Sequence, residues 1–539
     1  MYTIHALSAG AAVLAATLLL QHLFQRRSVV SRLPVAPAEE ASKLWGHEYK
    51  VFKGEVSAEY TRWAALLGQV FRIKTAFFQG DRVIVADNLV AQHIFQACTL
   101  PIFLTKISPA IIQNAYIYLK SQAFQPIVVK VVGRGVAWAE GEEHKFQRRL
   151  LVPAFTPSAV QKMLDDVIQC AEKCASRLAS EVDAQGNTGI VNLSLYIPPC
   201  MLEIICRVGF GRDFGHESPD AQAILGSWRE DVQKFSTFPA FLAPIVIGMF
   251  PWIAKLPIAA LQEDGIAKKV IQRVTGDLLK QPSSPDGSDI LSVLVRESWS
   301  GKDDSSAKLS SQQLLDNITT VVMAGFEASS GNVMFTLLDL ARNIKVQTKL
   351  REELAGTELD SKSIENLPYL DAVTRESLRL HPSSAETCRT AMCDDTIPLR
   401  NPVTLQNGEI ITALPVKAGD QFTIPFTLLN TNPAIWGPNA HEFIPERWMT
   451  PDGVPPSKDL PHGPWTNVST FGDGPHACIG WRLAVMQIKI VLAIMIRAFE
   501  FKDSGVKIYK MMSPSLQPFV DDEAATLPLH ISLVHPHME

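Results

Sequence analysis

Apolar residues recur at helical spacing through most of the sequence. The clearest runs are Val160–Ala179, Leu202–Val208, Ile266–Leu279 and Ser311–Ala341. Ser310 and Gln313 stand in the register of a capping box before the longest run. Two β-rich runs, Val70–Phe77 and Arg82–Ala86, flank a Gln-Gly-Asp turn and predict a hairpin. The pattern predicts a mainly α fold with small β-sheets, an α+β arrangement.

The first 27 residues have a different pattern. Tyr2–Gln25 contains no charged residue, and it is long enough to cross the apolar core of a bilayer as a helix. Arg26 and Arg27 follow directly, and positive charge on that flank favours leaving the rest of the chain in the cytosol. A cleaved signal peptide would carry its positive residues first. We therefore expect residues 1–27 to be a single-pass membrane anchor.

Prolines shape two further segments. Pro34 and Pro37 cannot continue a helix, so residues 28–43 are expected to form a short linker before a globular body at 44–539. A second uncharged run, Phe238–Ala254, is interrupted by three prolines, which argues against a spanning helix. This run is either a buried loop with short helices or a surface that dips into the membrane.

Composition excludes several classes of protein. The 539 residues include 50 Lys and Arg against 55 Asp and Glu, and 47% are hydrophobic. These values exclude a disordered chain and a basic nucleic-acid binder. Eight cysteines without a C-x-x-C pair indicate reduced, mostly buried thiols. Cys170 and Cys174 would need a second pair to hold a metal, and the sequence has none. A large packed enzyme remains.

The middle of the longest helical run is unusual. In "MAGFEASSG", Gly325, Glu327, Ser329 and Gly331 interrupt an otherwise apolar pattern. Glycine weakens a helix, and a buried carboxylate is costly without a partner. We expect a helix that deforms to accept something against this face. The alternative is a helix that packs closely on another backbone, with Glu327 reaching water.

A cysteine loop near the C-terminus carries the strongest chemical signal. In "FGDGPHACIGWRLAV", Gly474 and Gly480 flank Cys478, and an apolar helical segment follows. Glycines permit a tight loop whose amides point at one sulfur, and a helix N-terminus adds positive potential. Such a loop is expected to stabilise a thiolate, which suits an axial ligand of haem iron. An inert buried cysteine would not explain both glycines.

Together these segments resemble the cytochromes P-450. Phe471, Gly474, Cys478 and Gly480 fit the family's haem-binding pattern F-x-x-G-x-R-x-C-x-G. "ESLRLHP", "FIPERW" and "AGFEAS" resemble its E-x-x-R helix, its P-E-R segment and its oxygen-side helix signature. All occur in family order, and the resemblance covers about residues 44–536. It implies a P-450 fold with haem between the long central helix and the cysteine-loop helix.

The resemblance also implies roles for other residues. Arg148 in "EGEEHKFQRRLLVPAF" and Arg389 match contacts to the haem propionates, for which a guanidinium is a suitable donor. Glu376, Arg379 and Arg447 would form a buried ion network that is structural rather than catalytic.

Two positions depart from the family pattern. His476 stands where an arginine usually contacts a propionate, so haem binding is expected to be weaker or to depend on pH. Ala328 replaces the usual threonine after the acid. Proton delivery is then expected through Glu327 and Ser329, or through a hydroxyl of the substrate.

The implied function is a membrane-anchored haem-thiolate monooxygenase at 44–539, held at the endoplasmic reticulum with its body in the cytosol. It would use haem b (iron protoporphyrin IX), dioxygen, and electrons from NADPH through a separate NADPH-cytochrome reductase. A lipophilic small molecule, such as a terpenoid or other secondary metabolite, is the expected substrate. The alternatives are a haem-thiolate isomerase or dehydratase without external electrons, and a non-catalytic haem-binding protein. The reductase is expected to dock near Lys145, Arg149, Arg482 and Lys489.

Overall fold

The computed structural model of the chain describes residues 28–96, 117–121, 123, 125–256, 263–280, 287–299, 308–465 and 467–534. The expected anchor at residues 1–27 lies outside these ranges. The chain folds into two compact units. Unit 1 consists of residues 1–122, 385–437 and 457–476, and unit 2 consists of residues 123–384, 438–456 and 477–539. The body that was expected at 44–539 is therefore divided between the two units.

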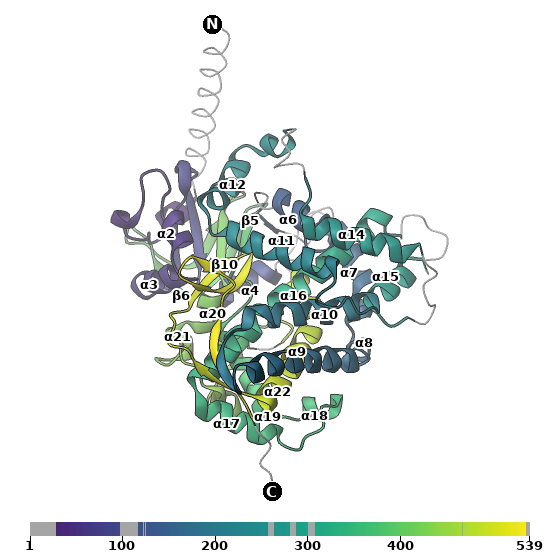
Figure 1. Cartoon of the computed structure of the whole chain (residues 1–539). Coiled ribbons are helices and arrows are strands. Elements are labelled where there is room, and N and C mark those ends of the chain that lie inside the picture. The colour runs from purple at the N-terminus through teal and green to yellow at the C-terminus, as the bar shows by residue number, and fades with distance from the viewer. Residues whose placement is uncertain are drawn as a thin grey trace. The chain divides into compact units, whose positions relative to one another are not determined.

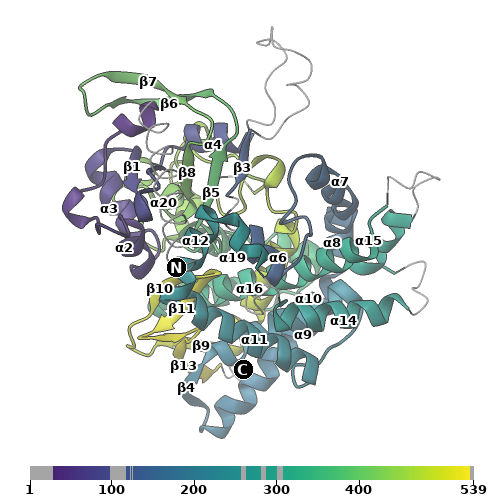
Figure 2. The same ribbon diagram turned by 90° about the horizontal axis from the view of Figure 1, so that it is seen from above.

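Unit 1 contains a five-stranded sheet of order β1-β2-β8-β5-β3. The strands are β1 (Val70–Lys74), β2 (Asp81–Val85), β3 (Tyr118–Lys120), β5 (Glu386–Ala391) and β8 (Gln421–Pro425). β1 and β2 pair in antiparallel fashion with Val70 opposite Val85, which confirms the predicted hairpin. β6 (Asp395–Thr404) and β7 (Ile410–Val416) form a long separate hairpin (Figure 2).

Helices and apolar clusters complete unit 1. The helices are α2 (Glu48–Lys53), α3 (Ala58–Leu67), α4 (Asn88–Gln96), α20 (Phe426–Thr431) and α21 (Pro433–Trp436). Successive strand residues face opposite sides of the sheet. Val83 and Val85 therefore belong to one buried cluster, whereas Ile84 lies in a second cluster with Phe71 and Ile73.

The segment expected to be a linker, residues 28–43, is packed into unit 1. Val30 and Leu33 belong to the first apolar cluster, and Ala36 belongs to the second. The amide of Arg72 in β1 donates to the carbonyl of Pro34 at 2.8 Å, and the amide of Ala36 donates back to Arg72 at 3.0 Å. These two hydrogen bonds hold residues 34–36 against the edge of β1.

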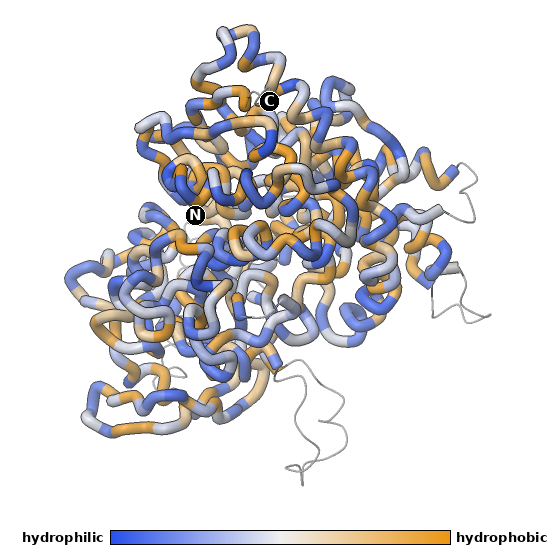
Figure 3. Tube along the Cα trace, turned by 90° about the horizontal axis from the view of Figure 1, so that it is seen from below, coloured by the Kyte–Doolittle hydropathy of each residue, from blue (hydrophilic) through white to orange (hydrophobic). Residues whose placement is uncertain are grey.

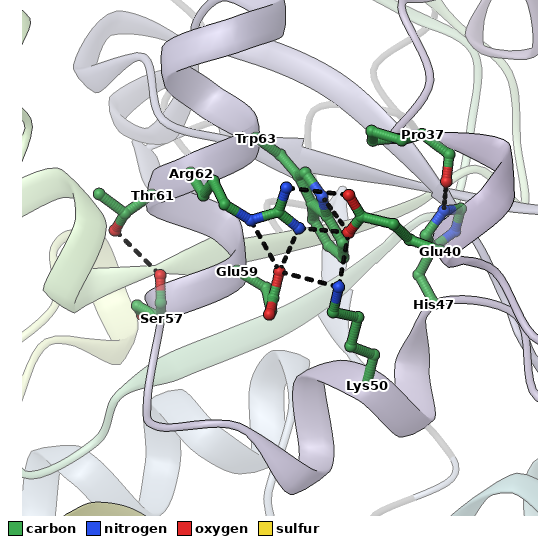
Figure 4. Close-up of polar contacts among 9 residues, drawn as sticks. All are labelled: Pro37, Glu40, His47, Lys50, Ser57, Glu59, Thr61, Arg62 and Trp63. Atoms are coloured by element: carbon green, nitrogen blue, oxygen red, sulfur yellow. Dashed lines mark hydrogen bonds and ion pairs between the residues drawn. The ribbon is translucent and has the colours of Figure 1, made fainter.

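A polar network fixes the end of this segment (Figure 4). The Glu40 carboxylate accepts hydrogen bonds from Arg62 at 2.9 Å, Lys50 at 2.7 Å and the Trp63 indole at 3.2 Å. Arg62 and then Lys50 lower the pKa of Glu40 to about 2. His47 contacts the carbonyl of Pro37 at 3.1 Å. Residues 37–40 are therefore joined to α2 and α3.

Unit 2 is mainly helical. Its α-helices are α6 (Gln125–Val131), α7 (Gly141–Leu151), α8 (Pro157–Gln161), α9 (Leu164–Ala184), α10 (Ile197–Phe210), α11 (Pro219–Phe235), α12 (Phe238–Met249), α14 (Ile266–Leu279), α15 (Ile290–Trp299), α16 (Ser311–Arg342), α17 (Ile344–Leu354), α18 (Ser361–Glu365), α19 (Pro368–Leu380) and α22 (Trp481–Ala498). These bounds confirm the predicted runs Leu202–Val208, Ile266–Leu279 and Ser311–Ala341, whereas the run Val160–Ala179 is divided between α8 and α9. Ser310 with Gln313 forms the predicted capping box. Figure 3 shows hydrophobic and hydrophilic stretches following one another along the coiled parts of the chain.

The long helix α16 is the centre of unit 2. It packs against α10, α14, α22 and strands β9 and β11 (Figures 1 and 2). Two three-stranded sheets complete the unit. They are β4 (Thr188–Asn192), β13 (Pro528–Leu533) and β9 (Phe499–Asp503), and β10 (Tyr509–Ser513), β11 (Ser515–Val520) and β12 (Glu523–Ala524).

Apolar helices in unit 2 are mostly covered by other parts of the chain. Among the described residues, Leu193–Phe210 and Ser311–Arg342 are long and apolar enough to span a membrane, but 83% and 78% of their apolar 18-residue windows are buried inside the protein. α11 and α12 together pass the same test with a bend of 78°. The run Phe238–Ala254 forms α12 and a 3₁₀ turn, in which Phe238 and Trp252 are exposed.

Candidate active site

The middle of α16 has an uncovered strip. Ala324 is exposed and Gly325, Glu327 and Ala328 are partly exposed, although the residues on both sides along the helix are buried. Residues at these spacings lie on one side of a helix. The strip is formed by small residues and one carboxyl group, so this side of the helix is open to a flat group.

The glycines of α16 permit close packing. A Cβ on Gly331 would lie 2.4 Å from the carbonyl oxygen of Leu516 in β11, and a Cβ on Gly325 would lie 2.6 Å from the Ile205 side chain of α10. The helix is continuous over Ser311–Arg342. The structure thus differs from the expectation of a deformed helix and matches the alternative of close backbone packing.

Glu327 is held by a residue from another element. The Ser515 hydroxyl donates to Glu327 Oε1 at 3.0 Å. Burial raises the pKa of Glu327 to about 7, although the Ser515 hydroxyl and amide favour the charged form. The indole of Trp228 also favours that form, but its Nε1 makes no hydrogen bond of good geometry within the described residues. This carboxyl group can therefore release and take up a proton near neutral pH.

Ser329 points to a different neighbour. It is buried, and Gln487 Nε2 of α22 donates to its hydroxyl oxygen and, at 3.2 Å, to the carbonyl of Gly325. The carbonyl of Ala328 accepts from the Ser383 hydroxyl at 2.7 Å. The two predicted catalytic residues thus take their hydrogen bonds from different elements, Glu327 from β11 and Ser329 from α22.

Cys478 lies in unit 2 just before α22. Solvent can reach its side chain, yet the surrounding chain is close enough for burial to raise the pKa of the thiol. The Gly480 amide and the positive charge of Arg148 oppose this rise. The Gly480 amide acts in the direction expected of the loop, but desolvation outweighs it and Arg148. A bound cation would be needed to hold the charged form.

The two glycines that flank Cys478 have different roles. Gly474 has φ +67°, and a Cβ there would lie 2.1 Å from the carbonyl oxygen of Phe95. Only glycine fits this position. Gly480 has φ −89° and ordinary space around it, so it contributes its N–H to Cys478 rather than conformational freedom.

The other predicted cofactor-binding residues lie in unit 1. Phe471 is buried, with its ring centroid 6.1 Å from that of Trp465. His476 ends a short 3₁₀ turn that begins at Gly474. Arg389 is buried in β5, and its guanidinium donates to the carbonyl of Cys388 at 3.0 Å.

The structure brings together the predicted ion network. The Glu376 carboxylate accepts two hydrogen bonds from Arg379, both at 2.9 Å, and one from Arg447 at 2.8 Å. The Trp448 indole and the amide of Ile444 also donate to it, each at 2.9 Å. Glu376 and Arg379 have no exposed surface, and Arg447 is 6% exposed. Five donors around one buried carboxylate give this network a structural role.

The expected docking charges do not all lie at the surface. Lys489 is buried and pairs with Asp371 at 2.6 Å, so its prediction as a docking residue is wrong. Arg482 is partly exposed, and its guanidinium lies 4.2 Å from the Trp481 ring centroid. Arg149 and Lys145 are exposed on α7. Helical periodicity placed Lys489 and Arg482 together, but it cannot reveal a partner such as Asp371.

The residues of unit 2 fit a haem group. The Cys478 thiol, with its amide donor, would bind haem iron, and the nearby Arg148 guanidinium would bind a propionate. The strip at Ala324 and Ala328 suits an apolar ring. Within the described ranges, no three His, Cys, Asp or Glu side chains gather as a direct metal site. An iron that is already held by a porphyrin needs one protein ligand, and Cys478 can supply it.

Comparison with known proteins agrees with this geometry. The family model described as "Cytochrome P450" matches residues 108–521. Cytochrome P450 monooxygenase 205 of Postia placenta is 28% identical over 91% of this chain and 91% of its own. Cytochrome P450 monooxygenases claU and claO of Ampulloclitocybe clavipes are 29% and 28% identical and cover 95% and 88% of this chain. In both cases most of the relative's length is also covered, 94% and 88%. The chain therefore belongs to the cytochrome P450 family and is a haem-thiolate monooxygenase.

Proposed function

We propose that this monooxygenase oxidises a lipophilic small molecule, such as a terpenoid or other secondary metabolite, while it is anchored in the endoplasmic reticulum membrane. Electrons come from NADPH through a separate reductase. The observation that carries the proposal is the reachable thiol of Cys478 beside the Gly480 amide and Arg148.

Several residues hold the cofactor in this proposal. Cys478 binds the iron, and the Gly480 N–H and Arg148 favour its negative charge. Arg148 and Arg389 bind the propionates, and His476 takes the place of a further arginine. When bound, haem supplies the activation of dioxygen. Phe471 and Gly474 shape the loop, because one is buried and the other has a conformation that only glycine adopts freely.

The proton needed for the reaction passes through Glu327. A pKa of about 7 lets its carboxyl group donate and recover a proton at cytosolic pH. Ser329 is proposed as an auxiliary hydroxyl whose orientation is set by Gln487. Ala328 itself has no hydroxyl, so it leaves an apolar surface beside the acid.

The substrate class is proposed from the apolar surfaces. Ala324 and Ala328 offer no polar group for recognition on the uncovered strip of α16. Phe238 is 42% exposed and Trp252 is 59% exposed, and both lie in the second apolar run. Together with the uncharged stretch Tyr2–Gln25, they support a membrane address and a substrate that partitions into lipid.

The reductase is proposed to bind a basic surface that includes Lys145 and Arg149. Both are exposed on α7, and Lys145 pairs with the exposed Glu142 of the same helix at 2.6 Å. Exposed pairs of this kind exchange partners at little cost. Complementary charge mainly accelerates encounter, so this surface is expected to act on the rate of electron delivery.

The deciding experiment is turnover in microsomes with a reductase, NADPH and a panel of lipophilic compounds, with product identification. We expect an oxygenated product that gains one oxygen atom from labelled dioxygen and requires NADPH. Cys478→Ala serves as the matched inactive protein. A product that forms equally without NADPH would instead assign an isomerase or dehydratase activity. Stoichiometric haem without product from any compound would favour a non-catalytic haem-binding protein.

A further inference from the structure

The acid of α16 receives its hydrogen bond from a strand. Ser515 is the first residue of β11, and its hydroxyl donates to Glu327 Oε1 at 3.0 Å. The same hydroxyl oxygen accepts from Gln517 Nε2 at 2.8 Å. Gln517 has no exposed surface, and its Oε1 has no hydrogen-bond partner among the described residues. Gln517, Ser515 and Glu327 thus form a chain of donors that ends at the carboxyl group.

The backbone fixes this arrangement. The carbonyl of Leu516 lies directly against Gly331, one helical turn after Glu327, where a Cβ would approach it to 2.4 Å. The amide of Leu516 donates to the carbonyl of Ser383 at 2.8 Å. Ser515 is therefore held at α16 by contacts of its own neighbour, and its hydroxyl does not depend on a mobile side chain to reach the acid.

The helix itself offers no hydroxyl to Glu327 at the adjacent positions. Ala328 has none, and the hydroxyl of Ser329 accepts a hydrogen bond from Gln487 of α22. Among the described residues, the side-chain hydroxyl that donates to Glu327 is that of Ser515 in β11.

We infer that Ser515, supported by Gln517, is the positioning residue of Glu327. The inference rests on the proposed function of Glu327 as the proton donor. Ser515 acts through Glu327 and has no contact of its own with the reaction in this scheme.

Opposing effects on Glu327 explain why such a residue is needed. Burial favours the neutral acid, and the negative charge of Asp231 on α11 acts in the same direction. A hydroxyl that donates to the carboxylate favours the charged form. Without Ser515 the pKa of Glu327 would rise further, and the carboxyl group would release its proton less readily at neutral pH. With Ser515 its pKa stays at about 7.

Infrared difference titration of the full-length holoprotein tests the inference without turnover. The carboxyl band of Glu327 is assigned by its loss in Glu327→Gln and is followed with pH in the parent, Ser515→Ala and Ser515→Thr. Ser513→Ala is the matched control, because Ser513 is a buried serine of β10 whose hydroxyl donates to the carbonyl of Val232. Loss of one hydrogen bond to a charged group is expected to raise the midpoint by about one to two pH units.

We expect the upward shift in Ser515→Ala, restoration in Ser515→Thr and no shift in Ser513→Ala. In reductase assays, Ser515→Ala is expected to release at least twice as much hydrogen peroxide per NADPH as the parent. An unchanged midpoint in Ser515→Ala, or an equal shift in Ser513→Ala, would overturn the inference. If the parent consumes no NADPH with the reductase, the proposed function fails, and the infrared midpoints still decide the role of Ser515.

Discussion

Replacing Glu376 with alanine tests the buried ion network most directly. The change leaves Arg379, which has no exposed surface, and Arg447, which is 6% exposed, without their shared anion. Each guanidinium keeps a backbone partner, since Arg379 donates to Ala440 at 2.6 Å and Arg447 donates to Asn439 at 3.2 Å. The loss is therefore that of a broken buried pair, about 3–5 kcal/mol.

Such a loss is large against the total stability of a folded protein, which is about 5–15 kcal/mol. We expect Glu376→Ala to unfold at clearly lower denaturant concentration and to be recovered with little haem. The assay combines guanidinium unfolding, followed by circular dichroism, with the haem content per polypeptide. Glu230→Ala is the control, because its pair with Lys234 at 2.9 Å is 63% and 67% exposed and is worth about 0.5 kcal/mol or less. Equal unfolding midpoints for Glu376→Ala and the parent would refute the reasoning.

Three further predictions concern the site and the membrane. Cys478→Ala is expected to abolish the red-shifted Soret band of the reduced, carbon monoxide-treated protein, and an unchanged band would rule out this ligand. Relative to the parent, Glu327→Gln is expected to gain stability as pH rises from 4.5 to about 7, by up to about 3 kcal/mol, because the raised pKa makes ionisation of Glu327 costly in the folded state. Denaturant unfolding of both proteins at pH 5 and pH 8 measures this gain. An equal difference between the two proteins at both pH values would contradict the prediction. Deletion of residues 1–27 is expected to leave part of the protein bound to lipid vesicles. Adding Phe238→Ser and Trp252→Ser to the deletion should release that part. Complete release by the deletion alone would favour the interpretation of Phe238–Ala254 as part of the protein core.

Local patterns predicted the parts of the site that depend on nearby residues. Glu376 and Arg379 are three residues apart on one helix, so their pairing follows from helical spacing. The contact between Ser515 and Glu327 joins residues 188 positions apart, and no local pattern marks a serine at the start of a strand as a partner for a helical acid. Lys489 shows the opposite failure, since its charge suggested the surface until the fold placed Asp371 beside it.

The segment before β1 has a mechanical consequence. Ser28 donates to Asp420 at 2.8 Å inside unit 1, and Leu33 has no exposed surface. Ser28 and Leu33 are therefore held against unit 1 at the start of the described chain. A pull applied at Ser28, for example by an optical trap, would load the Ser28–Asp420 hydrogen bond and the edge of β1. Force that reaches Ser28 would thus be transmitted directly to unit 1.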